Sequence, residues 1–90
     1  MVDTMIERID VAVFGAGRIG TIHADNVARH TRARLRYVVD VNAEAAGALA
    51  GRYGAQTSSV DATLADPAVG AVLICSSTDT HADLILRAAA

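Results

Sequence analysis

The chain has 90 residues, of which 52% are hydrophobic and 20% charged, and its formal net charge is −2. This composition excludes intrinsic disorder, and the lack of a basic surplus argues against a nucleic-acid-binding protein. No apolar run approaches the roughly 20 residues that span a bilayer, and the first residues lack the layout of a signal peptide. The single cysteine, Cys75, indicates a reducing compartment, so we expect a cytoplasmic protein without a membrane contact.

Short apolar runs alternate with helical patterns along the chain. Continuous apolar runs are typical of parallel strands that are buried on both faces, and they predict strands over residues 9–14, 35–39 and 70–75. A short extended piece over residues 56–58 is the candidate for the third strand in chain order, which makes 70–75 the fourth. The segments between them show helical periodicity and predict helices over residues 18–29, 42–53 and 59–66, with a last helix from residue 80 onward.

Apolar spacing within the first two predicted helices indicates which side of each faces the sheet. In the first helix we expect Ile19, Ile22 and Val27 to face inward, with His23 packed near the same side. The second helix should begin at Asn42 as its N-cap, present Ala45, Leu49 and Tyr53 to the core, and end at Gly54.

The alternation of strands and helices predicts an α/β fold, a Rossmann-like parallel sheet with flanking helices and the strand order 3-2-1-4. The last helical pattern has no stop signal before Ala90. We therefore expect residues 1–90 to be a partial dinucleotide-binding domain of three to four strands, without a substrate domain. The apolar strand at residues 70–75 would then be an open edge, which favours a homo-oligomer.

A glycine-rich motif, G-x-G-x-x-G, lies between the first predicted strand and the first predicted helix. In this position its glycines allow a tight turn, a close approach of a pyrophosphate to the backbone, and close packing of the helix on the sheet. The helix N-terminus adds unpaired N–H groups for the phosphates. The alternative is a turn that only joins strand to helix. The candidate cofactor-binding residues are Gly15, Ala16, Gly17, Arg18, Ile19 and Gly20.

An acidic residue, Asp40, ends the second predicted strand 20 residues after Gly20. A carboxylate there can accept hydrogen bonds from the adenosine ribose and would repel a 2′-phosphate, so the sequence predicts NAD in preference to NADP. Val41 completes this part of the candidate site, and neither Val41 nor Asn42 supplies a cation that would reverse the preference. The alternative role for Asp40 is helix capping.

Polar residues follow the fourth predicted strand, where ligands of doubly wound sheets bind. Ser76, Ser77, Thr78 and His81 are candidate contacts of the nicotinamide side, although Thr78 or Thr80 can instead cap the last helix and His81 can be a surface residue. Cys75 is expected to be a buried small side chain rather than a nucleophile, and the spacing of the histidines predicts no metal site.

The sequence from Val11 to Gly20, together with His23-Ala24, Asp40 and the segment C-S-S-T-D-T-H-A-D from Cys75, resembles the glucose–fructose oxidoreductase/inositol dehydrogenase/MocA family. The resemblance covers nearly all of residues 8–90. It implies the NAD-binding portion of an oxidoreductase that transfers a hydride from a polyol or sugar to NAD. Ser77 stands where the family often has a proline, which leaves the contacts of Ser77 open.

The resemblance also implies a catalytic lysine in a Glu-Lys-Pro motif and a later Asp/His pair. The 90 residues contain no lysine, so we expect no catalytic residue and no hydride transfer by this chain alone. Two alternatives stay open: a stand-alone nucleotide-binding module without catalysis, and a self-associating chain that binds nothing well.

Overall fold

The computed structural model describes residues 8–75, which form a four-stranded parallel sheet with helices on both faces. The elements in chain order are β1 (Ile9–Phe14), α1 (Arg18–Arg29), β2 (Ala33–Val39), α2 (Ala43–Tyr53), β3 (Gln56–Thr57), α3 (Val60–Ala65) and β4 (Val69–Ile74). The strand order is β3-β2-β1-β4, so the predicted fold class and strand order are confirmed.

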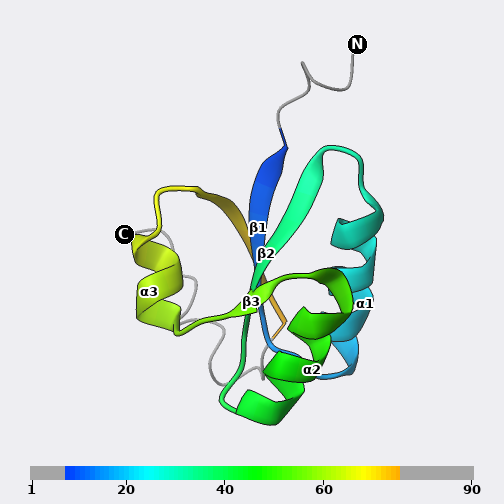
Figure 1. The fold of residues 1–90 in the computed structure, drawn as a ribbon, viewed down its shortest axis with the longest axis vertical. Coiled ribbons are helices and arrows are strands. Elements are labelled where there is room, and N and C mark those ends of the chain that lie inside the picture. The colour runs from blue at the N-terminus through cyan, green and yellow to red at the C-terminus, as the bar shows by residue number, and fades with distance from the viewer. Residues whose placement is uncertain (1–7, 76–90) are drawn as a thin grey trace.

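The helices divide between the two faces of the sheet according to the direction of each crossover. Helices α1 and α2 follow β1 and β2 and cover one face, whereas α3 leads from β3 to β4 across the other face (Figure 1). Right-handed crossovers that run in opposite directions along a sheet place their helices on opposite faces. Within the described residues, β4 therefore lies at one edge of the sheet with a single strand neighbour, β1.

Each face of β1 contributes to a separate hydrophobic cluster. Val11 and Val13 pack toward α1 and α2 with Leu35, Val38 and Leu49. On the α3 side, Ala12 and Phe14 pack with Val39 and with half-buried residues of α3 and β4. Because β1 is buried on both faces, both clusters hold the C-terminal end of β1 in place.

The pairing of β2 with β1 skips one residue. Val11 pairs with Leu35, but Ala12 pairs with Tyr37, so Arg36 has no partner in the ladder. This irregularity allows Arg36 and Tyr37 to reach the same carboxylate, Asp66, on the α3 side. Strand β2 also begins at Ala33, two residues earlier than predicted, in the segment where Arg34 pairs with Asp10 of β1.

The predicted inner side of α1 is wrong for Ile19, Ile22 and His23 and is confirmed for Val27. Ile19 and Ile22 are 56% and 51% exposed, and His23 is exposed rather than packed. The buried residues of the helix are Gly20, Ala24 and Val27. Gly20 approaches the Gly15 carbonyl of the loop closely, and Ala24 and Val27 lie on the same side of the helix, so the two isoleucines face outward.

The caps of α2 agree with the sequence prediction, whereas one core position does not. The Asn42 side chain accepts a hydrogen bond from Ala45 N–H at 3.0 Å, and Gly54 takes the left-handed conformation at the C-cap, with φ of 71°. Leu49 is buried as expected and Tyr53 is half-buried. Ala46 is buried in place of the predicted Ala45.

Candidate functional site

The glycine loop leaves the end of β1 through a turn that only glycine adopts easily. Gly15 has φ of 110°, in the region that side chains rarely enter. Its N–H donates to the Val39 carbonyl at 2.7 Å, which fixes the start of the loop to the end of β2. A Cβ on Gly20 would lie 1.8 Å from the Gly15 carbonyl oxygen, so the first turn of α1 touches the loop directly.

Gly17 faces open space at the N-terminus of α1. It is the N-cap of the helix, it makes no side-chain capping bond, and a Cβ built on it would meet nothing within 4 Å. The first N–H groups of a helix have no acceptor inside the helix and carry partial positive charge. Gly17 therefore leaves room at a point where backbone donors can meet an anion.

Asp40 lies at the end of β2 with its carboxylate turned toward this loop. One oxygen, Oδ2, accepts from Ala16 N–H at 2.6 Å, and the other, Oδ1, accepts from Asn42 N–H at 2.8 Å. The N-cap of α2 is Asn42, so Asp40 is not the capping residue that the alternative interpretation required. The side chain is half-buried, and an ionised carboxylate with two occupied positions retains capacity for further hydrogen bonds.

Val41 and Cys75 flank the site on two sides. The Val41 side chain is fully exposed beside Asp40. Cys75 follows β4, its N–H donates to the Phe14 carbonyl at 2.7 Å, and its Cβ lies 3.7 Å from the position a Cβ of Gly20 would take. Burial raises the pKa of the Cys75 thiol, so the group stays protonated near neutral pH and is a poor nucleophile.

The structure brings together the candidate residues of the first and second strand ends. Arg18 and Ile19 are exposed in the first turn of α1, next to the loop. The remaining candidates, Ser76, Ser77, Thr78 and His81, lie outside the described residues, as do Thr80 and the predicted last helix. Sequence analysis missed the direct bond between Asp40 and Ala16, because neither motif spacing nor composition indicates which donors a carboxylate meets.

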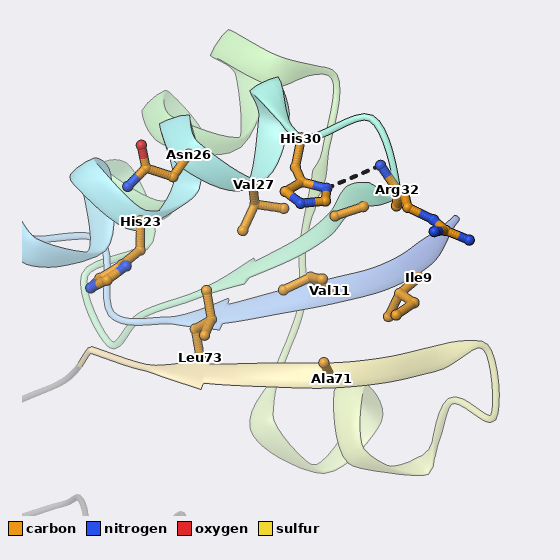
Figure 2. Close-up of a pocket in the computed structure, with 10 residues that line it drawn as sticks. Ile9, Val11, His23, Asn26, Val27, His30, Arg32, Ala71 and Leu73 are labelled. Atoms are coloured by element: carbon orange, nitrogen blue, oxygen red, sulfur yellow. Dashed lines mark hydrogen bonds between the residues drawn. The ribbon is translucent and has the colours of Figure 1, made fainter. Parts of the chain in front are cut away.

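A groove of about 540 Å³ lies away from the glycine loop, between α1 and the open side of β1 and β4 (Figure 2). Its apolar residues include Val11, Val27 and Leu73. Beside them lie His23 of α1 and His30, the residue that follows the end of α1. Both histidines are exposed. The Nδ1 atom of His30 accepts a hydrogen bond from the backbone N–H of Arg32 at 3.1 Å. The groove reaches the N-terminal ends of the strands, opposite the end at which doubly wound sheets bind nucleotides.

A cluster of ion pairs joins β1, β2 and the end of α3. Arg36 contacts Asp10 at 3.2 Å and Asp66 at 3.1 Å, and Tyr37 donates to Asp66 at 2.6 Å. The Tyr37 hydroxyl, the Ala68 N–H and the Arg36 guanidinium lower the pKa of Asp66. The Tyr37 and Asp66 side chains in turn raise the pKa of Arg36. Each charge in this cluster has a protein partner, so the cluster supports α3 rather than a ligand.

Two further findings concern the described part of the chain, residues 8–75. No three side chains of the types His, Cys, Asp and Glu come together there as metal ligands. None of its helices combines the length and apolar character that crossing a membrane requires.

The parallel sheet, the glycine loop between β1 and α1, and the carboxylate at the end of β2 define a dinucleotide-binding Rossmann domain. Comparison with known families identifies it further. Residues 9–90 match the model of the GFO_IDH_MocA family, described as an oxidoreductase family with an NAD-binding Rossmann fold. The chain belongs to this family, which confirms the resemblance noted in the sequence and the expected cofactor, NAD.

The relatives include inositol dehydrogenases. The chain is 49% identical over 75 residues to inositol 2-dehydrogenase of Rhizobium meliloti, covering 83% of this chain and 23% of the relative. Among solved structures, a putative myo-inositol dehydrogenase from Sinorhizobium meliloti has 47% identity and a TM-score of 0.88, covering 90% of this chain and 25% of that one. GenD2 from gentamicin A biosynthesis, solved in complex with NAD, has 36% identity and a TM-score of 0.88, covering 92% and 24%. The chain thus spans about a quarter of the length of the relatives it matches.

Proposed function

We propose that residues 1–90 form the first part of an NAD-binding domain, and that the glycine loop and Asp40 hold the adenosine diphosphate half of the cofactor. The single observation that carries this proposal is the position of the Asp40 carboxylate at the loop, 2.6 Å from Ala16 N–H. In this assignment the backbone from Gly15 to Gly20 faces the diphosphate and Asp40 accepts the ribose hydroxyls. Val41 borders the adenosine side.

The residues present fit that group. The open space at Gly17 admits a phosphate to the backbone, and the close contact of Gly20 with Gly15 keeps the helix N-terminus at the loop. Asp40 retains acceptor capacity, and its charge disfavours a 2′-phosphate. Ser76, Ser77, Thr78 and His81 are proposed to contact the nicotinamide half, on their place after β4.

The whole protein is proposed to be an NAD-dependent polyol or cyclitol dehydrogenase that resembles inositol 2-dehydrogenase. Bound NAD would supply the hydride acceptor. The 90 residues supply binding and orientation, and they hold no lysine that could serve as the family's catalytic lysine. We therefore propose that this chain alone binds the cofactor without turning over a substrate. The name of the relative, inositol 2-dehydrogenase, supports a cyclitol as the substrate class.

Titration calorimetry of the 90-residue chain with NAD and NADP tests the binding proposal. We expect binding of NAD, at least tenfold weaker binding of NADP, and loss of that preference in Asp40→Ala, because the like charge is removed. The matched control is Glu44→Gln, which removes a carboxylate from the first turn of α2 and should leave the preference intact. Equal affinity of the unmodified chain for both cofactors would contradict the assignment.

A catalytic test uses the same chain with NAD and myo-inositol. We expect no formation of NADH, whereas measurable NADH would show that the missing lysine is not required.

We also propose a reducing, cytoplasmic location on the basis of the single free thiol of Cys75.

A homo-oligomer is proposed from the edge of the sheet. Strand β4 consists of six residues without a charge or a proline, and within the described residues it pairs only with β1. Such an edge can add a strand from another copy. Light scattering over a range of concentrations should detect a dimer or larger species. Val72→Lys, which adds a charge to this strand, should shift the chain to monomer, whereas a monomer at every concentration of the unmodified chain would exclude the association.

A further inference from the structure

The Asp40 carboxylate bonds two backbone groups that belong to different parts of the site. Ala16 lies in the glycine loop after β1, whereas Asn42 begins the turn into α2. The distances, 2.6 Å to Ala16 N–H and 2.8 Å to Asn42 N–H, are those of hydrogen bonds that a charge strengthens. Asp40 therefore connects the loop to the turn that begins α2.

The geometry requires a side chain with two acceptor oxygens on a short stem. Asparagine has one acceptor oxygen and could serve only one of the two N–H groups, while alanine could serve neither. Ala16 is half-buried in the middle of the loop, and its N–H donates its hydrogen bond to Asp40. Gly15, in contrast, is bonded through its N–H to the Val39 carbonyl and does not depend on Asp40.

We propose that Asp40 is a positioning residue for the phosphate-binding loop, in addition to its proposed contact with the ribose. This inference rests on the proposed function for its consequence, whereas the loop contact is a hydrogen bond within the chain itself. It follows that replacing Asp40 weakens the binding of the phosphate part of a ligand. An exchange of Asp40 for a small neutral residue would then remove the barrier to NADP and at the same time loosen the loop that must hold its diphosphate.

Inorganic pyrophosphate separates this role from ribose recognition, because it contains the diphosphate and no sugar. If Asp40 acted only on the ribose, Asp40→Ala would remove a nearby negative charge and leave pyrophosphate affinity equal or higher. A positioning role predicts the opposite sign, a fall in pyrophosphate affinity of roughly tenfold. Chemical shift changes in the amide spectrum of the 90-residue chain can follow this weak binding.

The second measurement needs no ligand. Amide hydrogen exchange at Ala16 should become roughly tenfold to a hundredfold faster in Asp40→Ala, because a hydrogen bond to a charged acceptor is lost. Asp40→Asn, which keeps one acceptor oxygen, should give a smaller acceleration and guards against a variant that fails to fold. Gly15 N–H, bonded to Val39, serves as the internal reference and should stay protected.

Asn42→Ala is the matched control, since it removes the cap that Asn42 places on Ala45 and leaves the Ala16 bond in place. Exchange at Ala16 should be unchanged in that variant. Unchanged exchange at Ala16 in both Asp40 variants, or undiminished pyrophosphate binding in Asp40→Ala, would overturn the inference. If the unmodified chain binds neither NAD nor pyrophosphate, the proposed function fails, and the exchange rates still decide whether Asp40 holds the loop.

Discussion

Charged residues at the end of β2 and on its α3 face have different kinds of hydrogen-bond partner. At its C-terminal end, one carboxylate, Asp40, receives backbone N–H groups, and Gly17 faces open space nearby. On the α3 side, the side chains of Arg36 and Tyr37 both donate hydrogen bonds to the Asp66 carboxylate. A binding site needs hydrogen-bond donors and space that remain available to a ligand. In a structural cluster the donors are already bonded to acceptors of the protein. Charged residues in a sequence do not reveal which of the two arrangements they form, so substitutions must test the difference.

The largest expected effect comes from closing the contact under the loop. Gly20→Ala places a Cβ 1.8 Å from the Gly15 carbonyl oxygen, and α1 must move away from β1. Overpacking of this kind costs about 1–3 kcal/mol and occasionally more, and here the opposing atom is backbone. Urea denaturation should show this loss of unfolding free energy.

Gly47→Ala is the control for that variant, because a Cβ on Gly47 meets nothing within 4 Å on helix α2. It should keep or raise the stability, by up to about 1 kcal/mol. Equal stabilities of Gly20→Ala and Gly47→Ala would contradict the close packing of α1 at the loop.

A second substitution affects binding with little effect on folding. Gly17→Ala adds a methyl group in open space at a residue whose φ of −77° suits alanine, so the folding cost should stay below about 1 kcal/mol. The same methyl occupies the space proposed for the diphosphate, and NAD affinity should fall at least tenfold by calorimetry, about 1.4 kcal/mol. NAD affinity equal to that of the unmodified chain would move the diphosphate away from Gly17.

Acid should weaken the structural cluster through Asp66. Its pKa is lowered in the folded chain, chiefly by the hydrogen bond from Tyr37, so the unfolded chain takes up the proton first as pH falls. The stabilisation is fully present above the unfolded pKa, near 3.8, and is lost as pH falls through the lower folded value. Urea midpoints measured at several acidic pH values should decline less steeply in Asp66→Asn. A decline as steep as in the unmodified chain would assign the acid sensitivity to other carboxyl groups.

The smallest expected effect is kinetic and concerns Cys75. Because burial raises the pKa of its thiol, alkylation by iodoacetamide near neutral pH should be slower in the folded chain than in urea. Mass spectrometry can follow the modification over time. Equal rates in both states would mean that the thiol is not shielded beside the glycine loop.

Strands β1, β2 and β4 were predictable from their apolar runs, and the strand order from the usual topology of doubly wound sheets. The glycine loop and Asp40 were predictable for a similar reason, since their spacing along the chain reflects one βαβ unit. The inward side of α1 was not, because the isoleucines Ile19 and Ile22 suggested a face that close packing assigns to Gly20 and Ala24. The two hydrogen bonds that the Asp40 carboxylate accepts could not be predicted either, because they depend on where two backbone N–H groups lie in space.

The unpaired position of Arg36 has a consequence for how this strand tolerates changes of length. Because the ladder passes from Leu35 directly to Tyr37, removing Arg36 would leave the alternation of inward and outward side chains intact on both sides of the gap. Most single-residue deletions inside a strand would turn its following side chains over. Here a shortened chain would keep its interior and lose the contacts of the Arg36 guanidinium with Asp10 and Asp66, while Tyr37 would still bond Asp66.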